Sequence, residues 1–270
     1  MEFFLYFIVI SVTLYTVYFV VYLKLGIKYQ TKRQFPLLNK GVENKTGSLT
    51  DNFSVTTFNI HKGSIESFFF GDSSTRPAII VVHGNEGLID SNIDLAKALV
   101  SIGCHVLLVE YPGYGRSSGT PNEKSFLNLL TQTFDFLKSK NEVSKIIVYG
   151  SSMGGCVSAN LLKNRTPDAL ILRSTFINFG DLISKTAFLP RIAVKNGFFN
   201  EKLIREYSGK ILIMHGMNDN VVKYDNAIKL YNASKYPVFI KYEGGHESPA
   251  DNEVVKQTKL FLDKYIIEKS

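Results

Sequence analysis

The stretch KIIVYGSSMGG, residues 145–155, decides the fold of this chain. Its first half predicts a buried strand over Lys145–Tyr149, and the residues after the turn predict a helix over Gly155–Lys163. The turn itself reads Gly-x-Ser-x-Gly, and it is so tight that Gly150 and Gly154 must lack side chains. Such a strand–turn–helix holds the central Ser152 in a strained conformation with its hydroxyl exposed. The context favours a nucleophilic serine; the alternative is a glycine-rich turn that only helps packing.

Short apolar runs rich in β-branched and aromatic residues recur on both sides of this turn. They predict strands over Val55–Ile60, Ile65–Phe70, Ala78–Val82, Val106–Val109, Lys145–Tyr149, Ala169–Leu172, Ile211–Met214 and Val238–Tyr242. From the third run onward they are almost continuously hydrophobic, which is typical of parallel strands buried on both faces. Helical patterns lie between them, over Asp90–Ile102, Glu123–Lys138 and from Ala250 onward. This alternation predicts an α/β fold with a mostly parallel sheet covered by helices on both faces.

The stretch Thr175–Tyr207 breaks this rhythm. It is longer than an ordinary connection between strands, so we expect it to form helices of its own. It mixes phenylalanines with lysines and arginines. The simpler interpretation is a short helical cap packed on the domain. A sharper hypothesis is that its aromatic side chains line an acyl-binding groove near a membrane.

A serine hydroxyl needs a general base to act as a nucleophile. His246 follows two glycines in the loop after the last predicted strand, where it can reach the site. His83 and His215 also end strands, each as His-Gly, but we expect them to order backbone loops. A metal site is disfavoured, because no His-x-x-x-His or His-Glu spacing occurs. His246 is therefore the predicted base.

The base in turn needs a carboxylate that fixes its tautomer. Asp219 lies in the loop after the strand Ile211–Met214, at the carboxyl end where sites of parallel sheets are built. Asp225 is the alternative, but the pattern places it inside the next helix. The chain order Ser152, Asp219, His246 is the order found in α/β-hydrolases.

Two backbone N–H groups are expected to form an oxyanion hole. The strand Ala78–Val82 ends in His83-Gly-Asn85-Glu-Gly87, whose glycines let the backbone approach the nucleophile. We assign the N–H groups of Asn85 and Met153 to this role. No phosphate-binding loop of the Lys-Ser/Thr kind occurs, so nucleotide binding is disfavoured.

The N-terminal region predicts a membrane anchor. The run Phe3–Leu23 carries no charge, and as a helix it would be about 31 Å long, which matches a bilayer core. A cleaved signal peptide is less consistent, because Glu2 stands where a basic start is expected and no small-residue cleavage site follows. We divide the chain into an anchor (residues 1–24), a juxtamembrane linker (25–52) and a catalytic domain (53–270) with a cap at about 175–207.

The charge distribution supports a lipid partner. The chain has 31 Lys and Arg against 24 Asp and Glu, a net charge of +7. Several of these cations follow the apolar run directly: Lys24, Lys28, Lys32, Arg33, Lys40 and Lys45. The positive-inside rule then favours a single-pass protein with a cytoplasmic catalytic domain, although Asn-x-Ser/Thr sites leave a luminal side open. No basic block with interleaved aromatics points to nucleic acid.

Taken together, these motifs resemble the α/β-hydrolase superfamily over roughly residues 53–268, nearly all of the chain after the anchor. The segments that carry the resemblance are His83-Gly84-Asn85-x-Gly87, Tyr111-x-Gly113-Tyr114-Gly115-x-Ser117-x-Gly119, Gly150-x-Ser152-x-Gly154-Gly155 and Ser174-Thr175-Phe176. The combination is similar to the membrane-anchored, hydrolase-domain-containing, bud-emergence-like serine hydrolases. The chain departs from that pattern at Ser151, where many relatives have Gln or Arg, and at Glu86.

The resemblance implies an eight-stranded sheet, no cofactor, and hydrolysis of a small-molecule acyl ester or thioester that is lipid-like. Three residues would form the triad: Ser152, Asp219 and His246. Other activities stay open, because the fold does not fix the function. They are a serine peptidase, an acyltransferase, and a non-catalytic membrane adaptor that keeps the fold to bind a partner.

Overall fold

The computed structural model describes residues 2–38, 53–60, 63–186, 188–248 and 251–267. Its centre is one eight-stranded sheet in the order β1-β2-β4-β3-β5-β6-β7-β8. The strands are β1 (Ser54–Ile60), β2 (Gly63–Phe70), β3 (Arg76–Val82), β4 (His105–Val109), β5 (Val143–Ser151), β6 (Ala169–Arg173), β7 (Lys210–Gly216) and β8 (Pro237–Tyr242). Each contains one of the apolar runs found in the sequence.

The sheet is parallel from β4 through β8, whereas β1 and β2 pair antiparallel and β2 pairs antiparallel with β4. The parallel strands are buried on both faces because their residues are almost all apolar. Their carboxyl ends lie side by side, since Val82 pairs with Gly150 and Gly150 pairs with Leu172. The loops that leave these ends therefore meet at one edge of the sheet.

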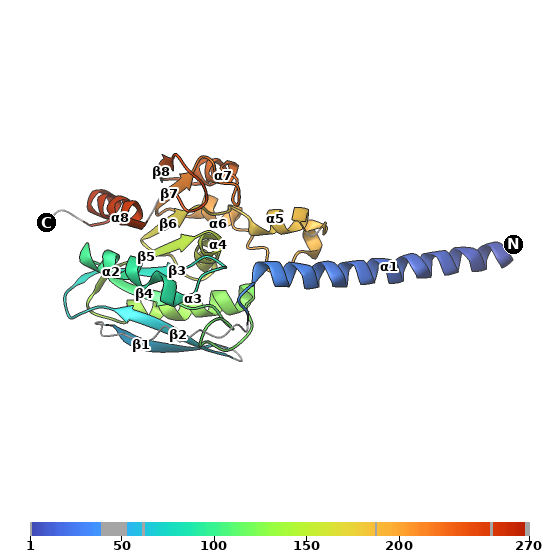
Figure 1. Ribbon diagram of the computed structural model, residues 1–270, viewed down its shortest axis with the longest axis horizontal. Helices are drawn as coiled ribbons and strands as arrows, with labels where there is room; N and C mark the ends of the chain where they lie inside the picture. The colour runs from blue at the N-terminus through green and yellow to red at the C-terminus, as the bar shows by residue number, and fades with distance from the viewer. Residues whose placement is uncertain (1, 39–52, 61–62, 187, 249–250, 268–270) are drawn as a thin grey trace.

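Helices cover both faces of the sheet (Figure 1). One face packs against α3 (Glu123–Lys138), α4 (Met153–Asn160), α6 (Glu201–Glu206) and α7 (Asp225–Ala233), and the other packs against α2 (Ile93–Ser101) and α8 (Asp251–Tyr265). Short 3-10 turns flank α2 and α4, at Ile89–Asn92 and Leu161–Lys163. The expected α/β architecture with an eight-stranded, mostly parallel sheet is confirmed.

The cap connects β6 to β7. It contains α5 (Phe179–Thr186), a 3-10 turn at Arg191–Ala193, and α6. Its phenylalanines face different environments: Phe198 is buried beside Phe126 of α3, whereas Phe188 is exposed at the tip. The predicted short helical cap is therefore present, with only part of its aromatic content in the core.

The N-terminal helix α1 (Glu2–Gln34) projects from the catalytic domain beside the cap (Figure 1). It is long and apolar enough to cross a membrane over Tyr6–Gln30, and the side chains described along that part are largely exposed. The helix does not end at residue 24, where we placed the end of the anchor. It continues because no proline occurs before Pro36, which disfavours helix at the preceding residue, Phe35. The rest of the expected linker, residues 39–52, lies outside the described residues.

Candidate active site

Ser152 lies at the sharp turn between β5 and α4. Its backbone has φ 52° and ψ −124°, a left-handed conformation that a serine adopts only under strain. The turn is held by a hydrogen bond from the Ser152 N–H to the carbonyl of Arg173, at 2.9 Å, and by the Thr175 hydroxyl, which donates to the Ser152 carbonyl. The predicted strand–turn–helix therefore has the strained geometry of a nucleophile elbow.

The glycines beside Ser152 are required by close backbone contacts. A β-carbon on Gly154 would overlap the carbonyl oxygens of Val82 and His83, and one on Gly150 would overlap the carbonyl of Gly154. These neighbours are backbone atoms of the central sheet and of α4, so they cannot move aside as a flexible side chain would. The turn can exist only because both positions lack a side chain.

We expect Gly154→Ala to lower the free energy of unfolding by about 1–3 kcal/mol, the usual cost of overpacking. Denaturant unfolding of the full chain in detergent measures the change. Gly87→Ala is the matched control, because a β-carbon there would meet its nearest neighbour at an ordinary 3.5 Å. Equal unfolding midpoints for the two variants would contradict the packing argument.

The structure brings the three predicted triad residues together. The Nε2 atom of His246 lies 3.1 Å from the hydroxyl of Ser152, and its Nδ1 atom lies 2.8 Å from Oδ2 of Asp219. The Asp219 side chain is fully buried, whereas that of His246 is 19% exposed. The alternative carboxylate, Asp225, is exposed at the first residue of α7. Of the two, Asp219 is the one in contact with His246.

The Asp219 carboxylate is held in a fixed orientation. Its Oδ1 atom accepts hydrogen bonds from the N–H groups of Val221 and Val222, each at 2.8 Å. Its Oδ2 atom faces His246 and lies 3.3 Å from Nε2 of His215. Burial lowers the pKa of His215, so this ring is neutral at neutral pH and Nε2 donates to the Val222 carbonyl at 2.8 Å. As expected, His215 orders the loop that carries Asp219.

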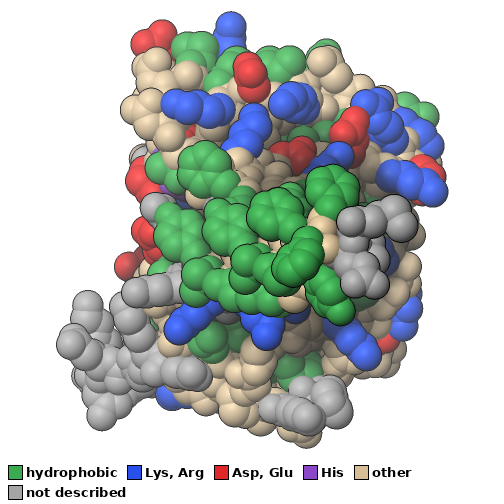
Figure 2. Space-filling view, turned by 90° about the vertical axis from the view of Figure 1, so that its right-hand side faces the viewer, with side chains coloured by type: hydrophobic (Ala, Val, Ile, Leu, Met, Phe, Trp, Pro, Cys, Tyr) green, Lys and Arg blue, Asp and Glu red, His purple; other side chains and the backbone are tan. Residues whose placement is uncertain are grey.

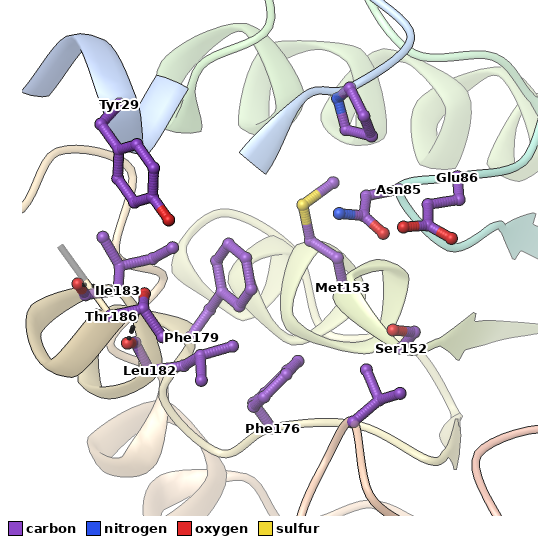
Figure 3. A pocket seen from close by; sticks show the side chains of 12 residues that line it. Tyr29, Asn85, Glu86, Ser152, Met153, Phe176, Phe179, Leu182, Ile183 and Thr186 are labelled. Atoms are coloured by element: carbon purple, nitrogen blue, oxygen red, sulfur yellow. Dashed lines mark hydrogen bonds between the residues drawn. The ribbon is translucent and has the colours of Figure 1, made fainter. Parts of the chain in front are cut away.

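The two backbone amides assigned to the oxyanion hole flank the serine. Met153 is the first residue of α4, so its N–H has no acceptor within the helix. The loop with Asn85 approaches Ser152 so closely that a β-carbon on Gly84 would lie 3.5 Å from Cβ of Ser152. Asn85, Met153 and Ser152 lie at the same end of the pocket in Figure 3. The Tyr114 hydroxyl donates to the carbonyl of Asn85 at 3.1 Å and holds this loop in place.

A buried carboxylate that the sequence did not reveal, that of Glu110, supports the same loop. Oε1 of Glu110 lies 2.9 Å from Nε2 of His83, and both side chains are buried. Glu110 also accepts hydrogen bonds from the N–H groups of Tyr111, at 2.7 Å, and Ile89, at 3.1 Å. His83 thus orders the loop before Asn85, as predicted. The only signal in the sequence for Glu110 is a single acid placed directly after a buried strand.

Two cavities meet at Ser152. The first, of about 560 Å³, is largely apolar and extends toward α5 and α1; it is lined by Tyr29, Pro36, Phe176, Phe179, Leu182, Ile183 and Thr186 among others (Figure 3). The second, of about 490 Å³, is polar and includes His83, Asn92, Tyr149, Arg173, His246 and Asp251. Both are also lined by Asn85, Glu86 and Val221. Sequence reasoning missed Tyr29 and Pro36, because both precede the predicted catalytic domain.

Arg173, at the end of β6, was also missed. Its guanidinium donates from one nitrogen to the carbonyl of Glu247 and from the other to the carboxylate of Asp251, both at 2.8 Å. Glu247 is the neighbour of His246, so Arg173 ties the loop of the base to the central sheet. The side chain is only 9% exposed, which leaves it little freedom to move. The side chain of Arg173 is positioned to fix the loop of His246, while its backbone carbonyl accepts the hydrogen bond from the Ser152 N–H.

Replacing Arg173 by methionine is expected to lower kcat for a short soluble ester by about 10²-fold, the cost of a displacement of about 1 Å in a catalytic group. KM should change little, and Arg173→Lys should restore part of kcat. Arg165→Met is the control: it removes an Arg–Asp135 ion pair of 2.7 Å that is exposed and far from the loop. A kcat equal to that of the control would show that Arg173 does not position the base.

Among the described residues, no group of three or more His, Cys, Asp or Glu side chains is arranged to hold a metal ion. Cys104 and Cys156 are buried and unpaired, and burial raises the pKa of each thiol to about 12. Neither cysteine reaches the cavities that contain Ser152.

The sheet is eight-stranded and mostly parallel, and Ser152 lies on a strained turn between β5 and α4. An aspartate and a histidine follow on the loops after later strands. This combination defines the α/β-hydrolase class. Comparison with known proteins agrees with this class. A family model described as "Serine aminopeptidase, S33" matches residues 73–197. Est1E from Butyrivibrio proteoclasticus superposes with a TM-score of 0.65 at 16% identity, over 78% of this chain and 98% of that one, which shows a shared fold.

Two curated relatives narrow the comparison. Lysophosphatidylserine lipase ABHD12 of Bos taurus is 31% identical over 182 residues, 59% of this chain and 46% of that protein. The alpha/beta hydrolase domain-containing protein WAV2 of Arabidopsis thaliana is 28% identical over 222 residues, 72% of each chain. The chain spans about half the length of the lipase relative. The chain belongs to the α/β-hydrolase superfamily.

Proposed function

We propose that this protein is a membrane-bound serine hydrolase that cleaves an acyl ester of a lipid-like substrate through Ser152, His246 and Asp219. The observation that carries the proposal is the continuous chain of contacts from the Ser152 hydroxyl through His246 to Asp219. The similarity to a lysophosphatidylserine lipase supports lipid esters as the substrate class. The apolar helix α1 supports attachment to a membrane.

The mechanism uses groups of this chain alone. His246 takes the proton from Ser152 as the serine oxygen attacks the acyl carbonyl, and Asp219 stabilises the imidazolium that forms. The N–H groups of Asn85 and Met153 donate hydrogen bonds to the oxyanion of the tetrahedral intermediate. His246 then protonates the leaving alcohol as the C–O bond breaks, which gives an acyl-enzyme. Water, deprotonated by His246, releases the acid and restores Ser152.

The two cavities favour a substrate with one acyl chain and a polar head. An acyl chain fits the apolar cavity toward Phe179 and Ile183, and a polar leaving group fits the cavity beside Arg173 and Asp251. Both cavities include Ser152, so a scissile ester between the two halves would lie at the nucleophile. A single-chain glycerol ester or lysophospholipid has this division, whereas a peptide backbone does not.

The decisive assay is a chain-length series of p-nitrophenyl and glycerol esters, measured with the full chain with and without liposomes. We expect turnover to rise from short to medium or long acyl chains. A matched set of acyl thioesters and aminoacyl p-nitroanilides tests the thioesterase and peptidase alternatives. A correctly folded protein that turns over none of these substrates would instead be the non-catalytic adaptor.

We also propose that α1 crosses the membrane once and that the catalytic domain faces the cytoplasm. The exposed Lys24 and Lys28, just past the apolar run, support this orientation by the positive-inside rule. Protease protection in sealed microsomes tests the side, because a luminal domain would be protected and could carry glycans at Asn164 and Asn232.

A further inference from the structure

The membrane helix is built into the catalytic domain along its last three turns. The hydroxyl of Tyr22 donates to the carbonyl of Phe188 at the cap tip. Gly26 packs so closely on the cap that a β-carbon there would lie 2.6 Å from a methyl carbon of Leu189. Further along, the amide of Gln34 donates to the carbonyl of Asn196 at 3.0 Å. Helix α1 and the cap are therefore one packed unit rather than a domain on a loose tether.

Two buried glutamines fix this packing. Gln30 is 1% and Gln34 is 0% exposed, and the two side chains hydrogen-bond to each other at 3.0 Å. The amide of Gln30 also donates to the carbonyl of Lys195. The carbonyl of Gln34 lies 3.5 Å from the side-chain amide of Asn85, in the loop assigned to the oxyanion hole. Contacts of the helix end thus reach the immediate surroundings of Ser152.

The same part of α1 lines the apolar cavity. Tyr29 projects from α1 into the space opposite Ile183 and Leu182 of α5 (Figure 3). Ser152 lies at one end of this cavity, and Tyr29 and Thr186, both exposed in part, lie at the other. The cavity therefore runs from the nucleophile to the surface between α1 and α5.

The surface at this outer end is apolar and cationic. Phe188 is 80% and Ile192 is 97% exposed at the cap tip, beside the end of the apolar run on α1. Figure 2 looks down the end of the molecule from which α1 projects toward the viewer, and it shows apolar side chains at the centre of this face, along α1, with lysines and arginines around them. Exposed cations on α1 and in the part of the cap from α5 to Lys195 include Lys24, Lys28, Lys185, Arg191 and Lys195. Apolar residues at a bilayer surface with cations at headgroup level match this arrangement.

We infer that α1 is part of the substrate site: with α5 it forms the wall of an acyl cavity that opens at the bilayer surface, and Phe188 and Ile192 insert into the bilayer beside it. An acyl chain then passes from the membrane into the cavity without crossing water. The identity of the substrate in this inference rests on the proposed function. The membrane contact of the cap tip is independent of that function. Residue Tyr29 is a specificity-determining residue in this arrangement, since it borders the path of the chain.

Insertion of the cap tip is tested by fluorescence, because the natural chain contains no tryptophan. The variant Ile192→Trp, in phosphatidylcholine vesicles with brominated acyl chains, should show blue-shifted emission and strong quenching. The control Leu260→Trp places the reporter on α8, at the opposite end of the molecule from α1, where Leu260 is 54% exposed (Figure 1). Emission quenched no more than in this control would overturn the insertion of the cap tip.

The role of α1 in the cavity is tested by chain-length selectivity. Tyr29→Trp narrows the space, so the ratio of kcat/KM for a long-chain ester over a short-chain ester should fall by about tenfold, within the range for small changes of an apolar pocket. Tyr18→Ala, on the lipid-exposed part of the same helix, should leave the ratio unchanged. An unchanged ratio in Tyr29→Trp, with short-ester turnover intact, would remove α1 from the substrate site. If the wild type hydrolyses no ester at all, the proposed function fails instead, and the quenching result still decides the membrane contact.

Discussion

Replacing Ser152 by alanine is expected to lower kcat by about 10⁶-fold, the loss seen when the nucleophile of a serine hydrolase is removed. The hydroxyl oxygen lies 3.1 Å from Nε2 of His246, and the loop assigned to the oxyanion hole packs closely against the same residue. A fluorophosphonate probe, which reacts with activated serines, should label the wild type and leave Ser152→Ala unlabelled. Both quantities are measured on the full chain in the same detergent or vesicles.

The fold should survive this substitution. Alanine removes one oxygen, and the backbone bonds that fix the turn, including the one to Arg173, stay in place. Ser101→Ala is the matched control, since Ser101 is an exposed serine at the end of α2. Equal labelling of Ser152→Ala and the control would show that another residue is the nucleophile. Labelling of the wild type without hydrolysis of any ester would point to a different acyl acceptor or substrate.

The positions of the triad residues could be predicted because each depends on a local signal. Ser152 lies between an apolar strand and a helix, in a turn that tolerates only glycine at Gly150 and Gly154. Asp219 and His246 lie in loops after strands, and in a parallel sheet the carboxyl ends of strands share one edge. Pairing of Leu172 with Ile213 and of Gly216 with Tyr242 brings the β6, β7 and β8 loops to that edge. The order of motifs along the chain thus sufficed for these three residues.

The residues that sequence reasoning missed depend on contacts between distant parts of the chain. Arg173 is a single cation at the end of a strand, and only the fold reveals that the loop after His246 lies against it. Tyr29 and Pro36 lie in a stretch that is polar and basic overall, which suggested a linker. The burial of Gln30 and Gln34 against the cap is not marked by apolar residues at helical spacing, because their partners are the carbonyls of Lys195 and Asn196.

The aromatic residues of the cap illustrate the same limit. Their mixture with cations indicated either a packed cap or an acyl groove, and the structure divides them between these environments. Phe176 and Phe179 line the apolar cavity, Phe198 packs in the core, and Phe188 is exposed at the tip. Spacing along the chain does not separate these environments: Phe188 and Phe198 both have a positive φ, yet one is exposed and the other is buried.

Asp219→Asn is expected to lower kcat by about 10⁴-fold while the fold is kept, by analogy with the same change in a serine protease. The asparagine can keep its oxygen at the position of Oδ1, where it still accepts from the N–H groups of Val221 and Val222. Its NH₂ group then replaces Oδ2 and faces Nδ1 of His246. An NH₂ group can only donate, so it favours the tautomer with the proton on Nε2. That tautomer cannot accept the proton of Ser152.

The measurement is the pH profile of kcat together with the unfolding midpoint of the full chain. Asp219→Asn should lose turnover across the neutral range with an unfolding midpoint close to that of the wild type. Asp225→Asn is the control, because Asp225 is exposed at the start of α7 and was the alternative carboxylate. If Asp225→Asn lost the larger part of the activity, the assignment of the carboxylate would be reversed. If Asp219→Asn retained full turnover, His246 would not need Oδ2 to fix its tautomer, and the proposed triad would reduce to a Ser152–His246 pair.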